Sequence, residues 1–128
     1  MFNEQAAWVS LRNAAEDIGR LPIATRAAIT GVLVAGSLVR GDFLAERSDV
    51  DVYTVLRGKV DQPYDTDAHR AVKSCFDRYF APYRGHCHHP QVWDDVCLSE
   101  TVLPAQSQDV TGQSIKGLGI YLFDLVLF

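Results

Sequence analysis

The chain has little of what marks secreted proteins or nucleic-acid-binding proteins. Its 128 residues include three cysteines, an odd number with no spacing that indicates pairing, so we expect free thiols in a reducing compartment. It has 12 lysines and arginines against 16 aspartates and glutamates, and its formal net charge is -4. Because no excess of positive charge attracts a phosphate backbone, we expect neither DNA nor RNA as a partner.

A long apolar run is also absent. The most apolar stretch, residues 118–128, is interrupted by Asp124 and is shorter than the roughly 20 residues that cross a bilayer. Since the first residues do not join a basic segment to an apolar one, we expect no signal peptide and a cytoplasmic protein without membrane contacts. The apolar end suggests burial against a partner subunit, as in a homodimer, or a chain that continues further.

What the sequence does have is the composition of one folded domain. Hydrophobic residues make up 48% of the chain, enough to bury a core, and no repeat divides it, so residues 1–128 are expected to form one domain. Periodicity and turn residues predict, in order, a helix over 4–20, a strand over 29–35, a strand over 49–56, a helix over 66–80 with Asp65 as its N-cap, a strand over 91–98 and a last helix from about 113. This order indicates an α/β or α+β fold with a small sheet covered by helices.

The end of the first predicted strand has the features of a phosphate-binding turn. Gly36 lets a ligand approach the backbone closely, and Ser37 adds a hydroxyl that can donate to a phosphate oxygen. If the next residues form a short helical turn, their N–H groups point to the same place. Arg40 either contributes a charged donor to this site or pairs with Asp42 or Glu46 on the surface, and the sequence leaves both interpretations open.

Two aspartates open the next predicted strand. Asp49 and Asp51 are two residues apart, so an extended backbone directs both carboxylates to one face, together with Tyr53. Two such carboxylates repel each other unless a cation lies between them, and Mg²⁺ prefers carboxylate and triphosphate oxygens. A bound Mg²⁺ would neutralise a pyrophosphate leaving group. A second ion, which activates an attacking hydroxyl, needs another acid from a neighbouring strand.

The combined pattern is more specific than either half. Within residues 33–56 an apolar run ends in Gly-Ser, Arg-Gly follows, and Ser-Asp-Val-Asp opens a second apolar run. This pattern resembles the core motif of the DNA polymerase β-like nucleotidyltransferase superfamily, and its closest branch is the minimal nucleotidyltransferases of bacteria and archaea. The resemblance implies the nucleotidyltransferase fold, a mixed sheet flanked by helices, with Mg²⁺ and with ATP or another nucleoside triphosphate. Gly36, Ser37 and Arg40 would then contact the nucleotide.

The resemblance also implies which acids bind the metal and take part in catalysis. Asp49 and Asp51 would be the first two carboxylates. The family's third carboxylate lies on the next core strand, where Asp94 and Asp95 are both candidates. We prefer Asp95 because the residues after it are more similar to the family's pattern, and alternation along a strand allows only one of the two neighbours to face the site.

The acceptor of the transferred group is left open by the sequence. Small members of this superfamily include antitoxin-type proteins that AMPylate a partner toxin, and domains that act beside a small helical partner subunit. The resemblance therefore implies transfer of a nucleoside monophosphate, AMP from ATP as the first choice, to a hydroxyl of a protein or a small molecule. The alternative is a module of the same fold that binds nucleotide or a partner with weak catalysis or none.

A second cluster of reactive side chains, residues 86–89 (His-Cys-His-His), is a weaker candidate for chemistry. Adjacent residues rarely supply several ligands to one tetrahedral zinc ion, and no second Cys or His pair at a suitable spacing completes a site. We favour a polar loop near the substrate cleft over a zinc site.

Overall fold

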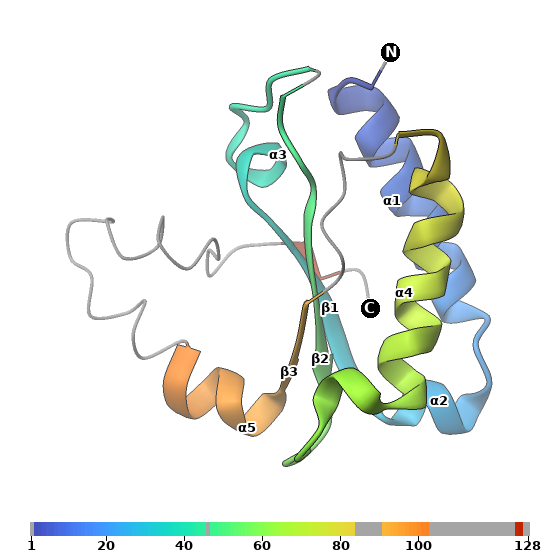
Figure 1. Cartoon of the computed structure of the whole chain (residues 1–128), viewed down its shortest axis with the longest axis vertical. Coiled ribbons are helices and arrows are strands. Elements are labelled where there is room, and N and C mark those ends of the chain that lie inside the picture. Colours follow the sequence, from blue (N-terminus) through green and yellow to red (C-terminus); the bar gives the residue numbers. More distant parts are fainter. Residues whose placement is uncertain (1, 46, 84–90, 103–124, 127–128) are drawn as a thin grey trace.

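A mixed four-stranded sheet with the order β3-β2-β1-β4 organises the chain (Figure 1). The computed structural model describes residues 2–45, 47–83, 91–102 and 125–126. The strands are β1 (Ile29–Ala35), β2 (Asp51–Leu56), β3 (Gln91–Asp94) and β4 (Leu125–Val126). β1 pairs antiparallel with β2 and with β4, whereas β2 and β3 are parallel. The expected class, a small mixed sheet flanked by helices, is confirmed.

Two long helices begin where short polar side chains cap them. Helix α1 (Glu4–Gly19) follows Asn3, whose side chain accepts a hydrogen bond from the Ala6 N–H, and it is followed by the short helix α2 (Ile23–Ala27). Helix α4 (Asp67–Phe80) is capped by Thr66, whose hydroxyl accepts the His69 N–H at 3.2 Å. The predicted cap, Asp65, was wrong by one residue because it belongs to the preceding 3₁₀ turn, η1 (Pro63–Asp65). Threonine and aspartate are both good caps, so the side-chain type alone could not decide.

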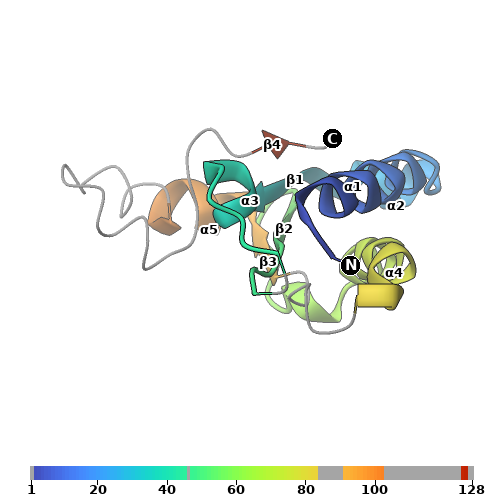
Figure 2. The same cartoon turned by 90° about the horizontal axis from the view of Figure 1, so that it is seen from above.

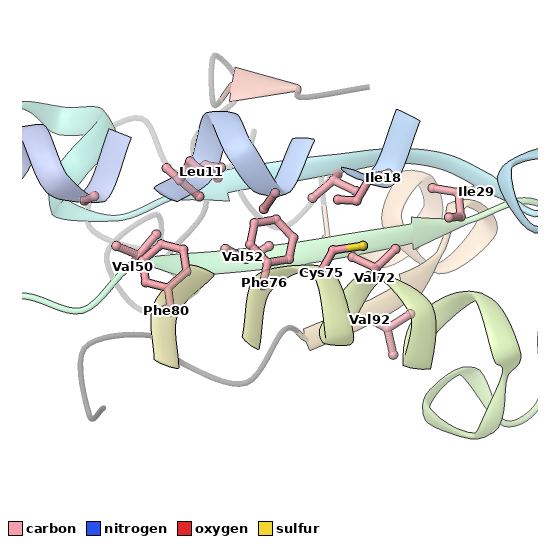
Figure 3. Packing of buried hydrophobic residues seen from close by; sticks show 14 of the residues in the cluster. Leu11, Ile18, Ile29, Val50, Val52, Val72, Cys75, Phe76, Phe80 and Val92 are labelled. Carbon is pink, nitrogen blue, oxygen red and sulfur yellow. The ribbon is translucent and has the colours of Figure 1, made fainter. Parts of the chain in front are cut away.

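The main core lies between the sheet and the pair α1 and α4, which run side by side on one face (Figures 1 and 2). From β2, Val50 and Val52 point into this core, where they meet Phe76 and Phe80 of α4 (Figure 3). Val50 precedes β2 as a single bridge residue and is fully buried. Because side chains alternate along a strand, burying residues 50 and 52 directs residues 51 and 53 to the other face of the sheet.

That second face carries a smaller apolar cluster under helix α5 (Asp95–Cys97) and the π-helical turn that follows it, Leu98–Val102. Tyr53 of β2 and Trp93 of β3 stack with ring centroids 4.7 Å apart and an interplanar angle of 11°. Cys97 and Leu98 pack against this pair. The cluster fixes β3 and α5 against the face to which Asp51 also points.

Two predicted elements differ from the structure. The third strand was expected over 91–98 but stops at Asp94, because the Asp94 side chain accepts the Cys97 N–H and so begins α5. The last helix was expected from about residue 113, but residues 125–126, within that span, form β4. The rest of that helix, and the cluster at residues 86–89, lie outside the described residues. Within the described part of the chain, no helix is long and apolar enough to span a membrane.

Candidate functional site

The Asp51 carboxylate lies close to the backbone of Gly36. Ala35, the last residue of β1, pairs with Asp51, the first residue of β2, so Gly36 follows directly beside the acid. Gly36 has φ 88° and ψ -155°, a conformation open essentially only to glycine. A Cβ atom placed on Gly36 would lie 2.6 Å from Asp51 Oδ2. The glycine is therefore required both by its backbone angles and by the carboxylate next to it.

A single helical turn, α3 (Ser37–Arg40), follows Gly36 and confirms the predicted turn (Figure 1). The Gly36 carbonyl accepts the Arg40 N–H at 3.1 Å, and the Ser37 carbonyl accepts the N–H groups of Gly41 and Asp42. Ser37 is half-buried at the start of this turn. The first N–H groups of such a turn have no acceptor within it, and the turn begins directly after Gly36, which lies beside the Asp51 carboxylate.

Arg40 forms a surface ion pair, which was one of its two expected roles. Its Nε lies 3.4 Å from Asp42 Oδ1, and the two side chains are 35% and 65% exposed. An exposed pair of this kind contributes little to stability. The Arg40 side chain thus braces the end of the α3 turn, at the edge of the site.

The other early acid, Asp49, lies just outside the strand. It precedes the buried residue Val50, and β2 itself begins at Asp51. Asp49 and Asp51 are both half-buried and flank Val50, whose side chain occupies the core, so the structure places both acids at the start of β2. Of the two, Asp51 is the acid that lies beside Gly36.

The structure does not bring Asp95 to this place, which corrects its assignment as the third metal-binding carboxylate. In the parallel pairing of β2 and β3, Asp94 is the partner of Leu56, at the far end of β2 from Asp51. Five residues of strand correspond to about 17 Å at about 3.3 Å per residue. Asp95 is one residue further along, in α5, at the end of the sheet opposite α3 (Figure 1). Asp94, the alternative candidate, is equally remote.

Asp94 and Asp95 instead bind backbone and hydroxyl donors at a place we call the β3–α5 junction (residues 94–97). Asp95 Oδ1 accepts the Gly58 N–H at 2.9 Å, and Asp95 Oδ2 accepts the Thr30 hydroxyl at 3.0 Å. Asp94 Oδ2 accepts the Val60 N–H at 3.0 Å, and its Oδ1 accepts an N–H of α5. The two acids therefore attach the segment after β2, and the start of β1, to α5.

These hydrogen bonds set the acidity of Asp94. The N–H groups of Val60 and Cys97 lower the pKa of the Asp94 carboxyl below its ordinary value of 3.8, because hydrogen bonds from N–H donors favour the charged form. Burial raises this pKa and is outweighed, and Lys59 adds a smaller lowering effect. Asp94 is thus an ionised, structurally engaged acid.

The two acids at the start of β2 fit a magnesium ion that is shared with a nucleotide. Mg²⁺ usually takes one or two protein carboxylates and completes its octahedral shell with substrate phosphates and water. Because Gly36 has no Cβ, the Asp51 carboxylate can lie against its backbone, directly beside the start of the α3 turn. Among the described residues, no group of three or more His, Cys, Asp or Glu side chains is placed to hold a metal without such a substrate.

Two further residues of the motif, which the sequence pattern left without a role, shape the site. Gly41 ends α3 with a left-handed backbone at φ 86°, the usual role of a glycine after a helix. Ser48 accepts the Leu44 N–H at 2.9 Å, just before Asp49. The position of Gly41 after a short helical turn is a readable signal, whereas a bond from Ser48 to a residue four positions earlier is not.

Comparison with known proteins adds one structural likeness. No family model and no curated protein matches the chain. A solved structure described as a "putative nucleotidyltransferase" from Sulfolobus solfataricus is 21% identical, with 77% of this chain and 81% of that chain covered and a TM-score of 0.40. A likeness at this level carries no argument about activity, so the functional assignment depends on the residues of the site.

Proposed function

We propose that the chain is a Mg²⁺-dependent nucleotidyltransferase that moves a nucleoside monophosphate, AMP from ATP as the first choice, to a hydroxyl acceptor. The observation that carries this proposal is the approach of the Asp51 carboxylate to the backbone of Gly36. This approach supports the proposal because it brings an acid that could bind a metal next to a turn that could bind phosphate, at one end of the two central strands. An ordinary solvated strand needs neither the positive φ at Gly36 nor an acid against it.

In this proposal the residues of the turn and of β2 divide the work. Donors at the start of α3, with the Ser37 hydroxyl, bind the β- and γ-phosphate oxygens and orient the triphosphate. Asp49 and Asp51 would hold Mg²⁺, which when bound neutralises the charge that develops on the pyrophosphate leaving group. Because phosphoryl-transfer catalysis is mainly positioning and electrostatics, these groups would align the triphosphate and stabilise the leaving pyrophosphate. The acceptor hydroxyl would attack the α-phosphorus and release its proton to solvent, since Asp94 and Asp95 are not at the site.

The acceptor we propose is a hydroxyl on a partner protein, as in antitoxin-type AMPylation. The described chain consists of one sheet with helices on both faces, and the residues described form no second lobe that could bind a large acceptor. A small helical partner, or a second copy of this chain, would supply the missing acceptor surface. A small-molecule hydroxyl is the competing acceptor.

The proposal is tested with matched aspartate variants. The experiment compares wild type with Asp49→Asn, Asp51→Asn and a control, Asp61→Asn. Asp61 is an exposed acid in the segment after β2. Each protein is incubated with Mg²⁺ and labelled ATP, CTP, GTP or UTP, with and without cell extract. We expect pyrophosphate release and a labelled acceptor with wild type and Asp61→Asn, and roughly a 100-fold loss in the two site variants, as for displaced catalytic groups. If no product forms with any of the four triphosphates, the proposal that the chain is an enzyme is refuted.

The second candidate is a nucleotide-binding module of the same fold with weak catalysis. One observation favours it: the oxygens of Asp94 and Asp95 are engaged at the β3–α5 junction, five strand residues or about 17 Å along the sheet from the level of Asp51. Binding of fluorescent ATP, together with pyrophosphate release, distinguishes the two candidates. A binding module would bind ATP in a Mg²⁺-dependent way, and Asp51→Asn would lose this dependence. Neither the wild-type module nor its variants would release pyrophosphate.

A further inference from the structure

The segment that leads into Asp49 is closed by a reciprocal pair of hydrogen bonds. The Leu44 N–H donates to Ser48 Oγ at 2.9 Å, and the Ser48 N–H donates to the Leu44 carbonyl, also at 2.9 Å. The Arg47 N–H donates to the same carbonyl at 3.1 Å. Ser48 thus joins the two ends of a tight loop by its side chain and by its backbone, one residue before Asp49.

The beginning of this segment is fixed to the α3 turn and to the core. The Ser37 carbonyl accepts two N–H groups, from Gly41 at 3.0 Å and from Asp42 at 3.1 Å. The Phe43 ring then meets the buried ring of Phe2 edge-on, with centroids 5.6 Å apart. The segment is therefore held at its beginning by the α3 turn and the core, and at its end by the pair formed by Leu44 and Ser48.

Asp49 depends on this segment because the sheet does not place it. The paired positions of β2 begin at Asp51, opposite Ala35, whereas Asp49 precedes the bridge residue Val50. Strand pairing therefore sets the backbone of Asp51 directly. The backbone of Asp49 is set from one side by Val50 in the core and from the other side by Ser48.

We infer that Ser48 is a positioning residue for the metal site: its hydroxyl, by accepting the Leu44 N–H, aligns Asp49 with Asp51. This inference rests on the proposed function, in which the two acids share one ion. Ser48 acts through the backbone of its neighbour. Loss of the hydroxyl should therefore weaken metal uptake while leaving the phosphate contacts of the α3 turn unchanged.

The experiment measures metal and nucleotide separately. Binding of Mn²⁺, in the presence of a non-hydrolysable ATP analogue, is followed by the loss of the free-ion electron paramagnetic resonance signal, and analogue binding is followed in EDTA. For Ser48→Ala we expect Mn²⁺ affinity to fall between about twofold and tenfold, the range for one hydrogen bond, with unchanged binding in EDTA. Ser48→Thr, which keeps a hydroxyl, should restore most of the Mn²⁺ affinity.

Two controls separate positioning from a general loosening. Ser99→Ala removes a serine bond of similar length, 3.2 Å to the Val96 carbonyl, at the other end of the sheet, and should leave Mn²⁺ affinity at the wild-type value. If Ser48→Ala does not fold, Ser48→Thr and Ser48→Val are compared, because they have the same shape and differ in the hydroxyl. If the Mn²⁺ affinity is equal in Ser48→Thr and Ser48→Val, or in wild type and Ser48→Ala, the role of Ser48 is refuted and the proposed function is not affected. A wild type that takes up no Mn²⁺ overturns it together with the proposed function.

Discussion

Two pairs of aspartates lie at opposite ends of the sheet, and their surroundings differ. At the β3–α5 junction, the oxygens of Asp94 and Asp95 accept N–H groups of Val60, Gly58 and Cys97 and one threonine hydroxyl. At the start of β2, the Asp51 carboxylate lies against the bare backbone of Gly36.

The comparison shows that the donors around a carboxylate, more than the carboxylate itself, decide what it does. A carboxylate whose oxygens accept several N–H groups stabilises the fold and keeps its charge at low pH. A carboxylate beside a positive-φ glycine, next to a turn that presents N–H donors, is arranged for an anion and a cation that arrive together. Asp94 illustrates the first outcome, and Asp51 has the second role in the proposed function.

The largest loss of activity is expected when one methyl group is added at Gly36. Gly36→Ala places a Cβ atom 2.6 Å from Asp51 Oδ2 and strains a backbone at φ 88°, so the carboxylate must move. We expect about a 100-fold loss of nucleotidyl transfer and a loss of about 1–3 kcal/mol in the free energy of unfolding. Transfer assays and urea denaturation measure the two effects.

Gly41→Ala is the matched control for this substitution. Gly41 has nearly the same φ, 86°, but a Cβ atom there would meet nothing within 4 Å. We expect a stability loss of about 1 kcal/mol and transfer within about twofold of wild type. If the two alanine variants lose transfer equally, backbone strain in the turn explains the loss and the contact with Asp51 does not matter.

The end of the sheet that carries the motif could be predicted from the sequence because its determinants are local. Gly36 and Ser37 follow an apolar strand, and Asp49 and Asp51 begin the next, so neighbours in the chain become neighbours in the antiparallel pair. The α3 turn and the polarity of each face follow from the same short stretch. Only the exact start of β2, two residues later than expected, depends on pairing with Ala35.

The other end could not be predicted because its determinants are distant in sequence. Asp95 bonds to Thr30, 65 positions away, and to Gly58, 37 positions away. Which residue of β2 lies opposite Asp94 is set by the register of a parallel pair, and no local pattern of residues 91–98 specifies it. The sequence also predicted a longer strand there. The strand ends because Asp94 caps helix α5, and the apolar residues that follow Asp94 are as typical of a strand as of a helix.

The second largest effect is a loss of stability when Asp95 is replaced. Asp95→Ala removes the acceptors of the Gly58 N–H and the Thr30 hydroxyl, so we expect a loss of about 1–3 kcal/mol in the free energy of unfolding. Nucleotidyl transfer at a temperature where the protein stays folded should remain within about twofold of wild type. Unchanged stability with transfer abolished would instead restore Asp95 to the catalytic site.

The smallest effect concerns pH and Asp94. The unfolded chain takes up a proton at the ordinary pKa of 3.8, whereas the folded protein, in which N–H donors lower this pKa, resists protonation. The stabilisation by Asp94 is therefore complete above this ordinary value and is lost as the pH falls through the lowered value of the folded state. We expect wild type to be more stable than Asp94→Asn at pH 7, and the gap to narrow below about pH 4 in urea titrations.

A second group, His69, also titrates, so the wild-type stability curve alone does not report Asp94. The useful quantity is the difference in the free energy of unfolding between wild type and Asp94→Asn. Burial lowers the pKa of His69 below 6.5, and the nearby charges of Lys73 and Arg70 lower it further. The unfolded chain then binds this proton first, so both proteins lose stability as the pH falls below about 6.5. Because His69 is common to both, its contribution cancels in the difference, and only a gap that narrows below about pH 4 reports Asp94. A gap of constant size down to pH 2 would mean that the N–H groups of Val60 and Cys97 do not favour the charged form, and the two ends of the sheet would then not differ in the way described.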